Sequence, residues 1–172
     1  IQGYANDREE ISEVEYRQVR LEKVVLVGLR TTQTEEEVET SLRELAALAQ
    51  TAGSQVLDAV VQKRVKPDPA TYLGSGKAKE LAGIVRAVEA DTVIVDEELA
   101  PSQRRGLEDV VDAKVVDRTA LILDIFAQHA KSREGKAQVE LAQLEYLLPR
   151  LRGWGDSMSR QAGGRVAGGA GI

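Results

Sequence analysis

The chain has 172 residues, 42% hydrophobic and 30% charged, so it can form a core, and with aromatic residues at only 3% that core must be aliphatic. It contains no cysteine and a single histidine, His129, which excludes a disulfide scaffold, an iron–sulfur cluster, a cysteine zinc site and a thiol nucleophile. The net charge of −5 argues against a protein that coats nucleic acid over its whole surface, and the short apolar runs predict a cytoplasmic protein without a membrane span.

The first half of the chain begins with a polar, acidic stretch at residues 1–22, which we expect to form an amino-terminal arm. The unbroken aliphatic run at 23–29 is typical of a strand buried on both faces of a sheet. Thr34, with Glu37 three residues later, predicts the start of a helix, and Gly53 predicts its end.

Strand-like and helix-like stretches alternate from there to residue 117. Short runs rich in Val predict strands, and Gly or Pro at the start of a periodic stretch predicts the first turn of a helix. The expected elements are a strand at 54–64, a loop with two prolines at 65–73, a helix at 74–88, a strand at 91–96, a helix at 101–111 and a strand at 114–117. This order predicts an α/β fold at 23–117, in which helices cover both faces of a small parallel sheet of four strands.

Residues 118–152 predict one long helix. Residues that are apolar except for Glu134 recur between Leu123 and Leu151 at alternating intervals of four and three, which is a heptad pattern. About 33 helical residues span about 50 Å, so we expect most of this helix to protrude as one arm of an α-hairpin. Its uncovered apolar seam predicts self-association of the chain. The alternative, a helix packed along its own sheet, is disfavoured by the length.

The last segment, 153–172, is rich in glycine and predicts a basic loop. Arginines contact phosphates, and a tryptophan offers a face on which unpaired bases stack. The candidate RNA-binding residues in and just before this loop are Arg150, Arg152, Trp154, Arg160, Gln161 and Arg165. Composition alone favours a flexible tether with scattered charge.

Two further groups of cations are candidates. Lys77 and Lys79 follow a glycine pair that predicts either a tight turn or a phosphate-binding helix start. This stretch is not a nucleotide-binding P-loop, because Thr71 stands where the motif needs its first glycine and Ala78 where it needs Ser or Thr. The second group, on the long helix, is either a solvated face or a contact with an RNA backbone; it consists of Lys131, Arg133 and Lys136.

Carboxylates follow two of the expected strands. Asp96, Glu97, Glu98 and Asp117 would lie at the carboxyl edge of the sheet, where α/β proteins bind ligands and where carboxylates could hold Mg²⁺. This arrangement favours a rival function, a metal-dependent enzyme domain that handles phosphate. The same carboxylates suit the positive ends of the helices that follow them. We therefore predict no catalytic, GTP-binding or metal-binding residue in this segment.

A resemblance to a known family rests on three stretches of the chain. The stretch KVVDRTALILDIFAQHAKSREGKAQVELAQLEYLLPRLRGWGDSMSRQAGG, at 114–164, resembles the HflX family of ribosome-associated GTPases. PDPATYLGSGKAKEL and ADTVIVDEELAPSQRRGLE resemble the sheet domain of the same family, and the likeness covers about residues 20–164.

The resemblance implies a function. In this family the sheet and a long helix pair precede a GTPase domain that binds GTP and Mg²⁺. The resemblance implies binding to the rRNA of the large (50S) ribosomal subunit, a helix-pair loop that reaches the peptidyl-transferase centre, and splitting of stalled or idle ribosomes under stress. The family continues into a GPGE motif, a second helix and the GTPase domain, which this sequence does not contain. A stand-alone helical oligomerisation module remains a further alternative.

Overall fold

The computed structural model describes the backbone of residues 22–165 and the side chains of residues 22–149. The elements are β1 (Lys23–Arg30), α2 (Glu35–Thr51), β2 (Gln55–Lys63), α3 (Ser75–Val88), β3 (Thr92–Val95), α4 (Pro101–Val111), β4 (Lys114–Asp117), α5 (Arg118–His129) and α6 (Arg133–Arg165). The α/β fold predicted from the sequence is confirmed. The expected amino-terminal arm lies, apart from Glu22, outside the described residues.

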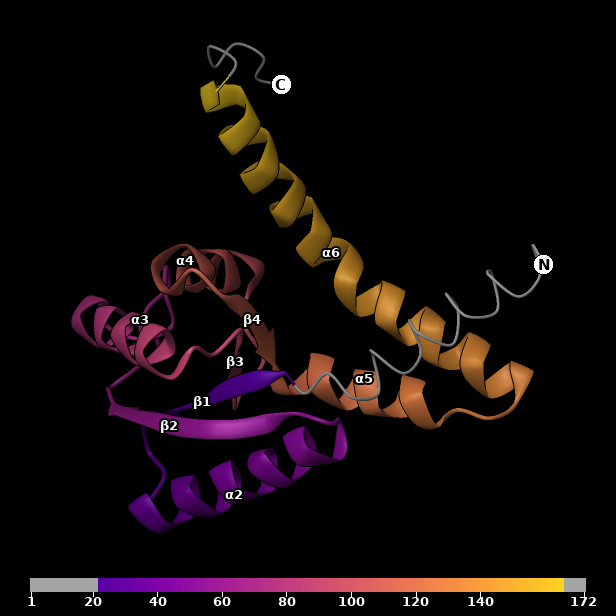
Figure 1. Ribbon diagram of the computed structural model, residues 1–172, viewed down its shortest axis with the longest axis horizontal. Coiled ribbons are helices and arrows are strands. Elements are labelled where there is room, and N and C mark those ends of the chain that lie inside the picture. The colour runs from indigo at the N-terminus through magenta and orange to yellow at the C-terminus, as the bar shows by residue number, and fades with distance from the viewer. Residues whose placement is uncertain (1–21, 166–172) are drawn as a thin grey trace, which may run out of the picture.

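The four strands form one parallel sheet in the order β2-β1-β3-β4. β1 is central, and every residue from Val24 to Leu29 is buried because helices cover both faces. Val25 and Val27 face the cluster under α3 and α4, whereas Val24 and Leu26 face α2 and α5. Figure 1 shows these two helix layers on opposite sides of the sheet.

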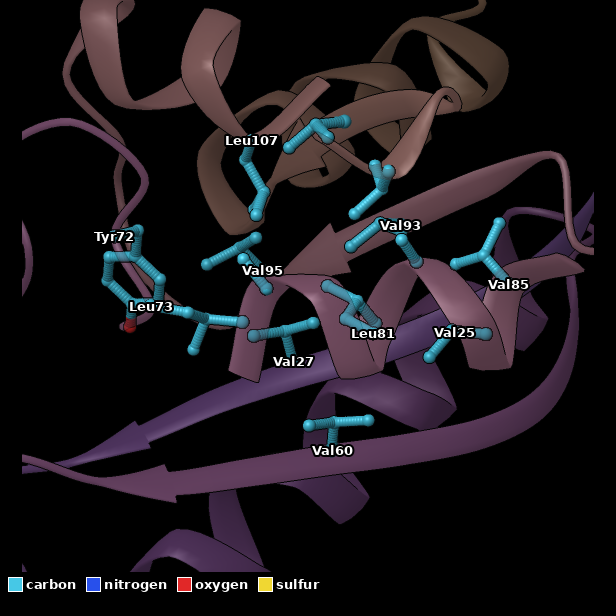
Figure 2. Close-up of a cluster of buried hydrophobic side chains, with 14 of the residues drawn as sticks. Val25, Val27, Val60, Tyr72, Leu73, Leu81, Val85, Val93, Val95 and Leu107 are labelled. Carbon is cyan, nitrogen blue, oxygen red and sulfur yellow. The ribbon is translucent and has the colours of Figure 1, made fainter. Parts of the chain in front are cut away.

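The larger core cluster lies between the sheet and helices α3 and α4 (Figure 2). Its members are Val, Leu and Ala with one exception, Tyr72, so the prediction of an aliphatic core is confirmed. Tyr72 is 1% exposed and has a φ of 65°, a left-handed conformation that is rare outside glycine.

The ends of α2 follow the predicted signals. The Thr34 hydroxyl accepts a hydrogen bond from the backbone N–H of Glu37 at 3.1 Å, which satisfies one donor of the first turn. Gly53 follows the helix with a φ of 92°, where a side chain would be strained.

The proline-containing loop before α3 is held by Asp68. The backbone N–H groups of Ala70 and Thr71 donate to its carboxylate at 2.8 Å and 3.0 Å, and they lower its pKa below the ordinary value. The side chain of Gln103 in α4 donates to the Asp68 carbonyl at 2.9 Å, so α4 is docked on this loop.

The single long helix expected at 118–152 is interrupted at residues 130–132. Ala130 has an extended ψ of 123°, and the Ser132 hydroxyl accepts a hydrogen bond from the Gly135 N–H at 2.9 Å, which starts α6. The chain reverses there, and α6 packs back against α5 and α4 (Figure 1). Gly135 therefore lies in a first turn rather than in the middle of a helix.

The loop expected at 153–172 also differs from the structure, because α6 continues to Arg165. Pro149 removes one backbone hydrogen bond within the helix, and each internal glycine costs about 1 kcal/mol relative to alanine. Extending a helix that already exists needs no new nucleus, so these residues can continue it. Residues 166–172 lie outside the described part. Among the helices of residues 22–165, none is both long and apolar enough to cross a membrane.

Gly106→Ala should destabilise the protein. A Cβ at Gly106 in α4 would lie 2.0 Å from the carbonyl oxygen of Ala70, so α4 would have to move away from the loop. We expect the free energy of unfolding, measured by urea denaturation, to fall by about 1–3 kcal/mol. The matched control is Gly83→Ala in α3, where a Cβ meets nothing within 4 Å, and where we expect a gain of about 0.5–1 kcal/mol. Equal effects of the two substitutions would contradict this account of the α4 contact.

Candidate functional site

The carboxylate of Asp117 connects four parts of the fold. Asp117 ends β4, is 2% exposed, and accepts hydrogen bonds from the backbone N–H groups of Leu99 and Ala120, each at 3.0 Å. The hydroxyl of Tyr146 in α6 donates to the same carboxylate. One side chain thus holds the loop after β3, the start of α5 and the middle of α6 against the end of β4.

Asp96 at the end of β3 is held by a neighbouring ion pair. The Arg118 guanidinium contacts the Asp96 carboxylate at 2.7 Å, and it also donates to the Ser41 hydroxyl at 3.2 Å and to Glu44 at 3.3 Å. Arg118 therefore joins α5, β3 and α2. Because Asp96 is nearly buried, this pair is screened less by solvent than a surface salt bridge.

These partners bear on the rival metal-site hypothesis. Asp96 and Asp117 have their oxygens engaged by Arg118, backbone N–H groups and Tyr146, which gives both carboxylates a structural role. Among residues 22–149, no group of three or more His, Asp or Glu side chains is placed to hold a metal ion. His129, at the end of α5, is exposed.

A small cavity of about 130 Å³ lies at the carboxyl ends of β1 and β3, where the strand order reverses. Its lining includes the carboxylates of Glu37, Asp96 and Glu97. Ligand pockets usually have about 300–1,000 Å³, and carboxylates repel phosphate, so this cavity does not suit a nucleotide.

Glu97, which is in the lining of this cavity, interacts with the side chain of Tyr72. Burial raises the pKa of Glu97 above its ordinary value, while the hydroxyl of Tyr72 opposes the shift and the charge of Asp96 adds to it. Burial likewise raises the pKa of Tyr72, and Glu97 adds to that shift. Within the described part of the chain, the Tyr72 hydroxyl forms no hydrogen bond of normal geometry.

A second hollow, of about 450 Å³, lies beside β4 and between α5 and α6. Asp117 and Tyr146 form part of its wall, together with Lys114, Asp124 and Gln143. It exists because α6 returns over the end of the sheet and is held there by Tyr146.

Lys77 and Lys79 lie in the first two turns of α3, as expected from the sequence. Lys77 is partly buried and pairs with Glu80 at 3.3 Å, whereas Lys79 is exposed. The backbone N–H of Gly74, the residue before the helix, donates to the Gln62 side chain at 2.8 Å.

The other predicted cations are far apart. Lys131, Arg133 and Lys136 are exposed at the turn between α5 and α6 and in the first turn of α6. The backbone of the predicted RNA-binding tract is helical and forms the other half of α6; its residues are Arg150, Arg152, Trp154, Arg160, Gln161 and Arg165. The structure therefore separates these two groups along a helix of 33 residues.

The predicted apolar seam remains uncovered on α6. Leu141, Leu144 and Leu148 are 58%, 52% and 55% exposed. The other side of α6 carries Tyr146 and Leu147, which are partly buried, so α6 has one covered and one uncovered apolar side.

Sequence reasoning missed Tyr146 and Arg118 as the residues that orient the helices. Nothing in the local sequence marks either one, because their partners lie 29 and 22 residues away. The helix-capping role considered for Asp117 is confirmed, since it accepts a hydrogen bond from the backbone N–H of Ala120.

Comparisons with known proteins agree with this architecture. The family described as "GTP-binding GTPase N-terminal" matches residues 39–127, and that described as "GTP-binding GTPase Middle Region" matches residues 129–172. The GTPase HflX of Alkalihalophilus pseudofirmus is 52% identical over 148 residues, which are 86% of this chain and 35% of that protein. The GTPase HflX of Escherichia coli is 45% identical over 144 residues, 83% of this chain and 33% of that protein.

A solved structure is similar as well. The crystal structure of a GTP-binding protein from the hyperthermophilic archaeon Sulfolobus solfataricus in complex with GDP matches with a TM-score of 0.57 at 28% identity, over 77% of this chain and 39% of that chain. A parallel α/β sheet followed by paired helices, with these matches, defines the amino-terminal and middle regions of a GTP-binding GTPase. The chain belongs to the HflX family, and it spans about a third of the length of the curated relatives that it matches.

Tyr146→Phe should weaken the attachment of α6 to the sheet. It removes the hydroxyl that donates to the buried Asp117 carboxylate. We expect the free energy of unfolding, measured by urea denaturation, to fall by about 1.5–3 kcal/mol, as for other hydrogen bonds to charged groups. The matched control is Tyr72→Phe, expected to lower it less, because that hydroxyl interacts with Glu97 but forms no hydrogen bond of regular geometry within residues 22–149. A loss for Tyr72→Phe as large as that for Tyr146→Phe would refute this assignment.

Glu97→Gln should change how stability depends on pH. The pKa of Glu97 is higher in the folded protein than in the unfolded chain, where it is about 4.3. As pH rises, the unfolded chain therefore loses this proton before the folded protein does. The free energy of unfolding of the wild type falls over the pH range between the two pKa values. We expect Glu97→Gln to be more stable than wild type at pH 7.5 and to lose that advantage at pH 4. Urea denaturation at both pH values measures this, and a difference that is independent of pH would contradict it.

Proposed function

We propose that this chain is the ribosome-binding region of an HflX-type GTPase and associates with the large ribosomal subunit through its rRNA. The main support for the proposal is the position and composition of α6. Its carboxyl-terminal half extends away from the sheet (Figure 1). Residues 150–165 of that half include four arginines and Trp154. A helix of 33 residues is about 50 Å long, which is enough to reach into a deep RNA cavity.

In this proposal the arginines bind phosphates, and Trp154 stacks on an unpaired base in the peptidyl-transferase centre. Lys131, Arg133 and Lys136 contact RNA from the other end of α6, and Lys77 and Lys79 do so from α3. The family's GTPase domain, with GTP and Mg²⁺, sets the affinity for the subunit. Binding then splits stalled or idle ribosomes under stress.

A second candidate function is self-association. Leu141, Leu144 and Leu148 form an exposed apolar row at heptad spacing, which is suited to pairing with another helix. Analytical ultracentrifugation of the chain, alone and with Leu144→Glu, tests it. A monomer at all concentrations would contradict this function.

Arg152→Ala combined with Arg160→Ala should weaken binding of the intact protein to large subunits. Each lost phosphate contact lowers the slope of log affinity against log salt by about 1. We expect affinity to fall at least about tenfold and the slope to fall by about 2 in co-sedimentation at several salt concentrations, with a non-hydrolysable GTP analogue present.

The matched control removes two cations elsewhere, Lys23→Ala with Arg43→Ala. Lys23 is exposed at the amino end of β1. Arg43 is exposed on α2, and among the side chains of residues 22–149 it forms an ion pair with Glu39 alone. We expect this pair to bind nearly as the wild type does. If both double variants lose the same affinity, the effect reflects net charge alone and the assignment of α6 is wrong.

A further inference from the structure

The two edges of the parallel sheet differ in length. β4 forms one edge with four residues, and the hollow under α6 lies beside it. β2 forms the other edge with nine residues (Figure 1). Within the part of the chain that the structure describes, no strand pairs with the outer side of β2. A long edge strand presents a row of backbone N–H and C=O groups to which another strand can add.

The hydrogen bonds between β1 and β2 show which residues of β2 face outward. The backbone N–H of Arg64, directly after the strand, donates to the carbonyl of Arg30 in β1 at 2.9 Å. The backbone groups of successive residues in a strand point to opposite sides. The N–H and C=O groups of Ala59, Val61 and Lys63 therefore point away from the sheet.

The outer edge of β2 lacks the features that usually prevent strands from pairing. β2 contains no proline, and its one bulge lies near its start, between Val56 and Asp58. From Asp58 to Lys63 the register with β1 is regular, and charged side chains occur only at the two ends of this stretch. Val61, near its middle, is 41% exposed. A proline or a central lysine would block or discourage an added strand, and neither is present here.

Two side chains of opposite charge share one face of this edge. Asp58 and Arg64 are six residues apart, so the strand alternation directs them to the same face. Asp58 is exposed, and its carboxylate accepts a hydrogen bond from the backbone N–H of Ala59 at 2.8 Å. The Arg64 guanidinium lies against Gly74, and its Nε donates to the carbonyl of Lys66 at 3.0 Å. Within residues 22–149, neither Asp58 nor Arg64 forms an ion pair.

We propose that the outer edge of β2 pairs antiparallel with the same edge of a second copy of this chain, about a two-fold axis at Val61. The two sheets then join into one continuous sheet of eight strands, because each copy contributes four. This inference goes beyond the proposed function. It uses a surface separate from the exposed leucines of α6.

The charges and the backbone directions favour this register. With the axis at Val61, Ala59 of each copy is opposite Lys63 of the other, and all three outward residues exchange N–H···O=C bonds across the axis. Asp58 of each copy is opposite Arg64 of the other, so the symmetry forms this pair twice. With the axis at Val60, Asp58 would instead be opposite Gln62, which carries no charge.

The test is sedimentation equilibrium of the intact protein over a range of concentrations, with ribosomes absent. We expect a dimer whose dissociation constant rises at least about tenfold for Asp58→Arg and for Arg64→Asp, because each variant alone places like charges opposite each other twice. A mixture of the two variants should associate about as tightly as the wild type, because every facing pair between them is again opposite in charge. Melting temperatures should show that both variants are folded.

Two control variants change other surfaces. Arg43→Glu alters the net charge as much as Arg64→Asp does, but it lies on the acidic outer side of α2, where Glu35, Glu36 and Glu39 are exposed. Leu144→Glu alters the exposed leucines of α6. We expect both control variants to dimerise as the wild type does.

Each contrary result overturns the inference in a different way. A wild-type protein that is monomeric at every concentration shows that β2 does not pair with a second copy. Loss of the dimer in Leu144→Glu, with both β2 variants unaffected, places the contact on α6. If the two β2 variants are weakened singly and their mixture is not restored, Asp58 does not face Arg64, and the proposed register is wrong. None of these results bears on RNA binding by α6, so the proposed function is tested separately.

Discussion

The structure depends on one buried carboxylate. Asp117 accepts hydrogen bonds from a backbone N–H after β3, a backbone N–H at the start of α5 and the hydroxyl of Tyr146 in α6. A buried charge without such partners would be strongly destabilising, so the three donors and the carboxylate require one another. The sheet and the helical part of the chain are therefore joined by a specific polar contact in addition to their apolar packing.

The position of α6 follows from this contact and its neighbours. α5 is attached to the sheet by Arg118, which binds Asp96, and by the buried side chain of Leu121. The chain reverses at Ser132, and α6 then passes over α5 and α4 on its way back. Because Tyr146 is held at the end of β4, the part of α6 beyond it extends away from the sheet (Figure 1). The basic residues of that part are thus carried on a helix with a fixed base.

Local patterns in the sequence were sufficient for most of the sheet domain. Thr34, Gly53 and Pro101 mark helix ends by chemistry that acts within a few residues, and the aliphatic runs mark buried strands. The break at 130–132 was missed because the four-three spacing continues through it, although Glu134 is a charged residue in that series. The helix at 153–165 was missed because glycine predicts a loop, whereas a helix already formed can be extended through it.

The candidate site was predictable only in part. Lys77 and Lys79 are close in sequence and could be recognised as a cluster. The contact of Arg64 with Gly74 and that of Tyr146 with Asp117 arise from the fold, and no local pattern indicates them. The acidic outer side of α2 could be read from its composition, but its position opposite α3 could not.

The attachment at Tyr146 also makes α6 a lever. From Tyr146 to the last described helical residue, Arg165, the chain runs 19 residues, which is about 28 Å of helix. A tilt of about 10° at that fulcrum would therefore displace the far tip by about 5 Å. A small change in the angle of α6 where the Tyr146 hydroxyl contacts the Asp117 carboxylate therefore moves the helix end at Arg165 by about the height of one helical turn.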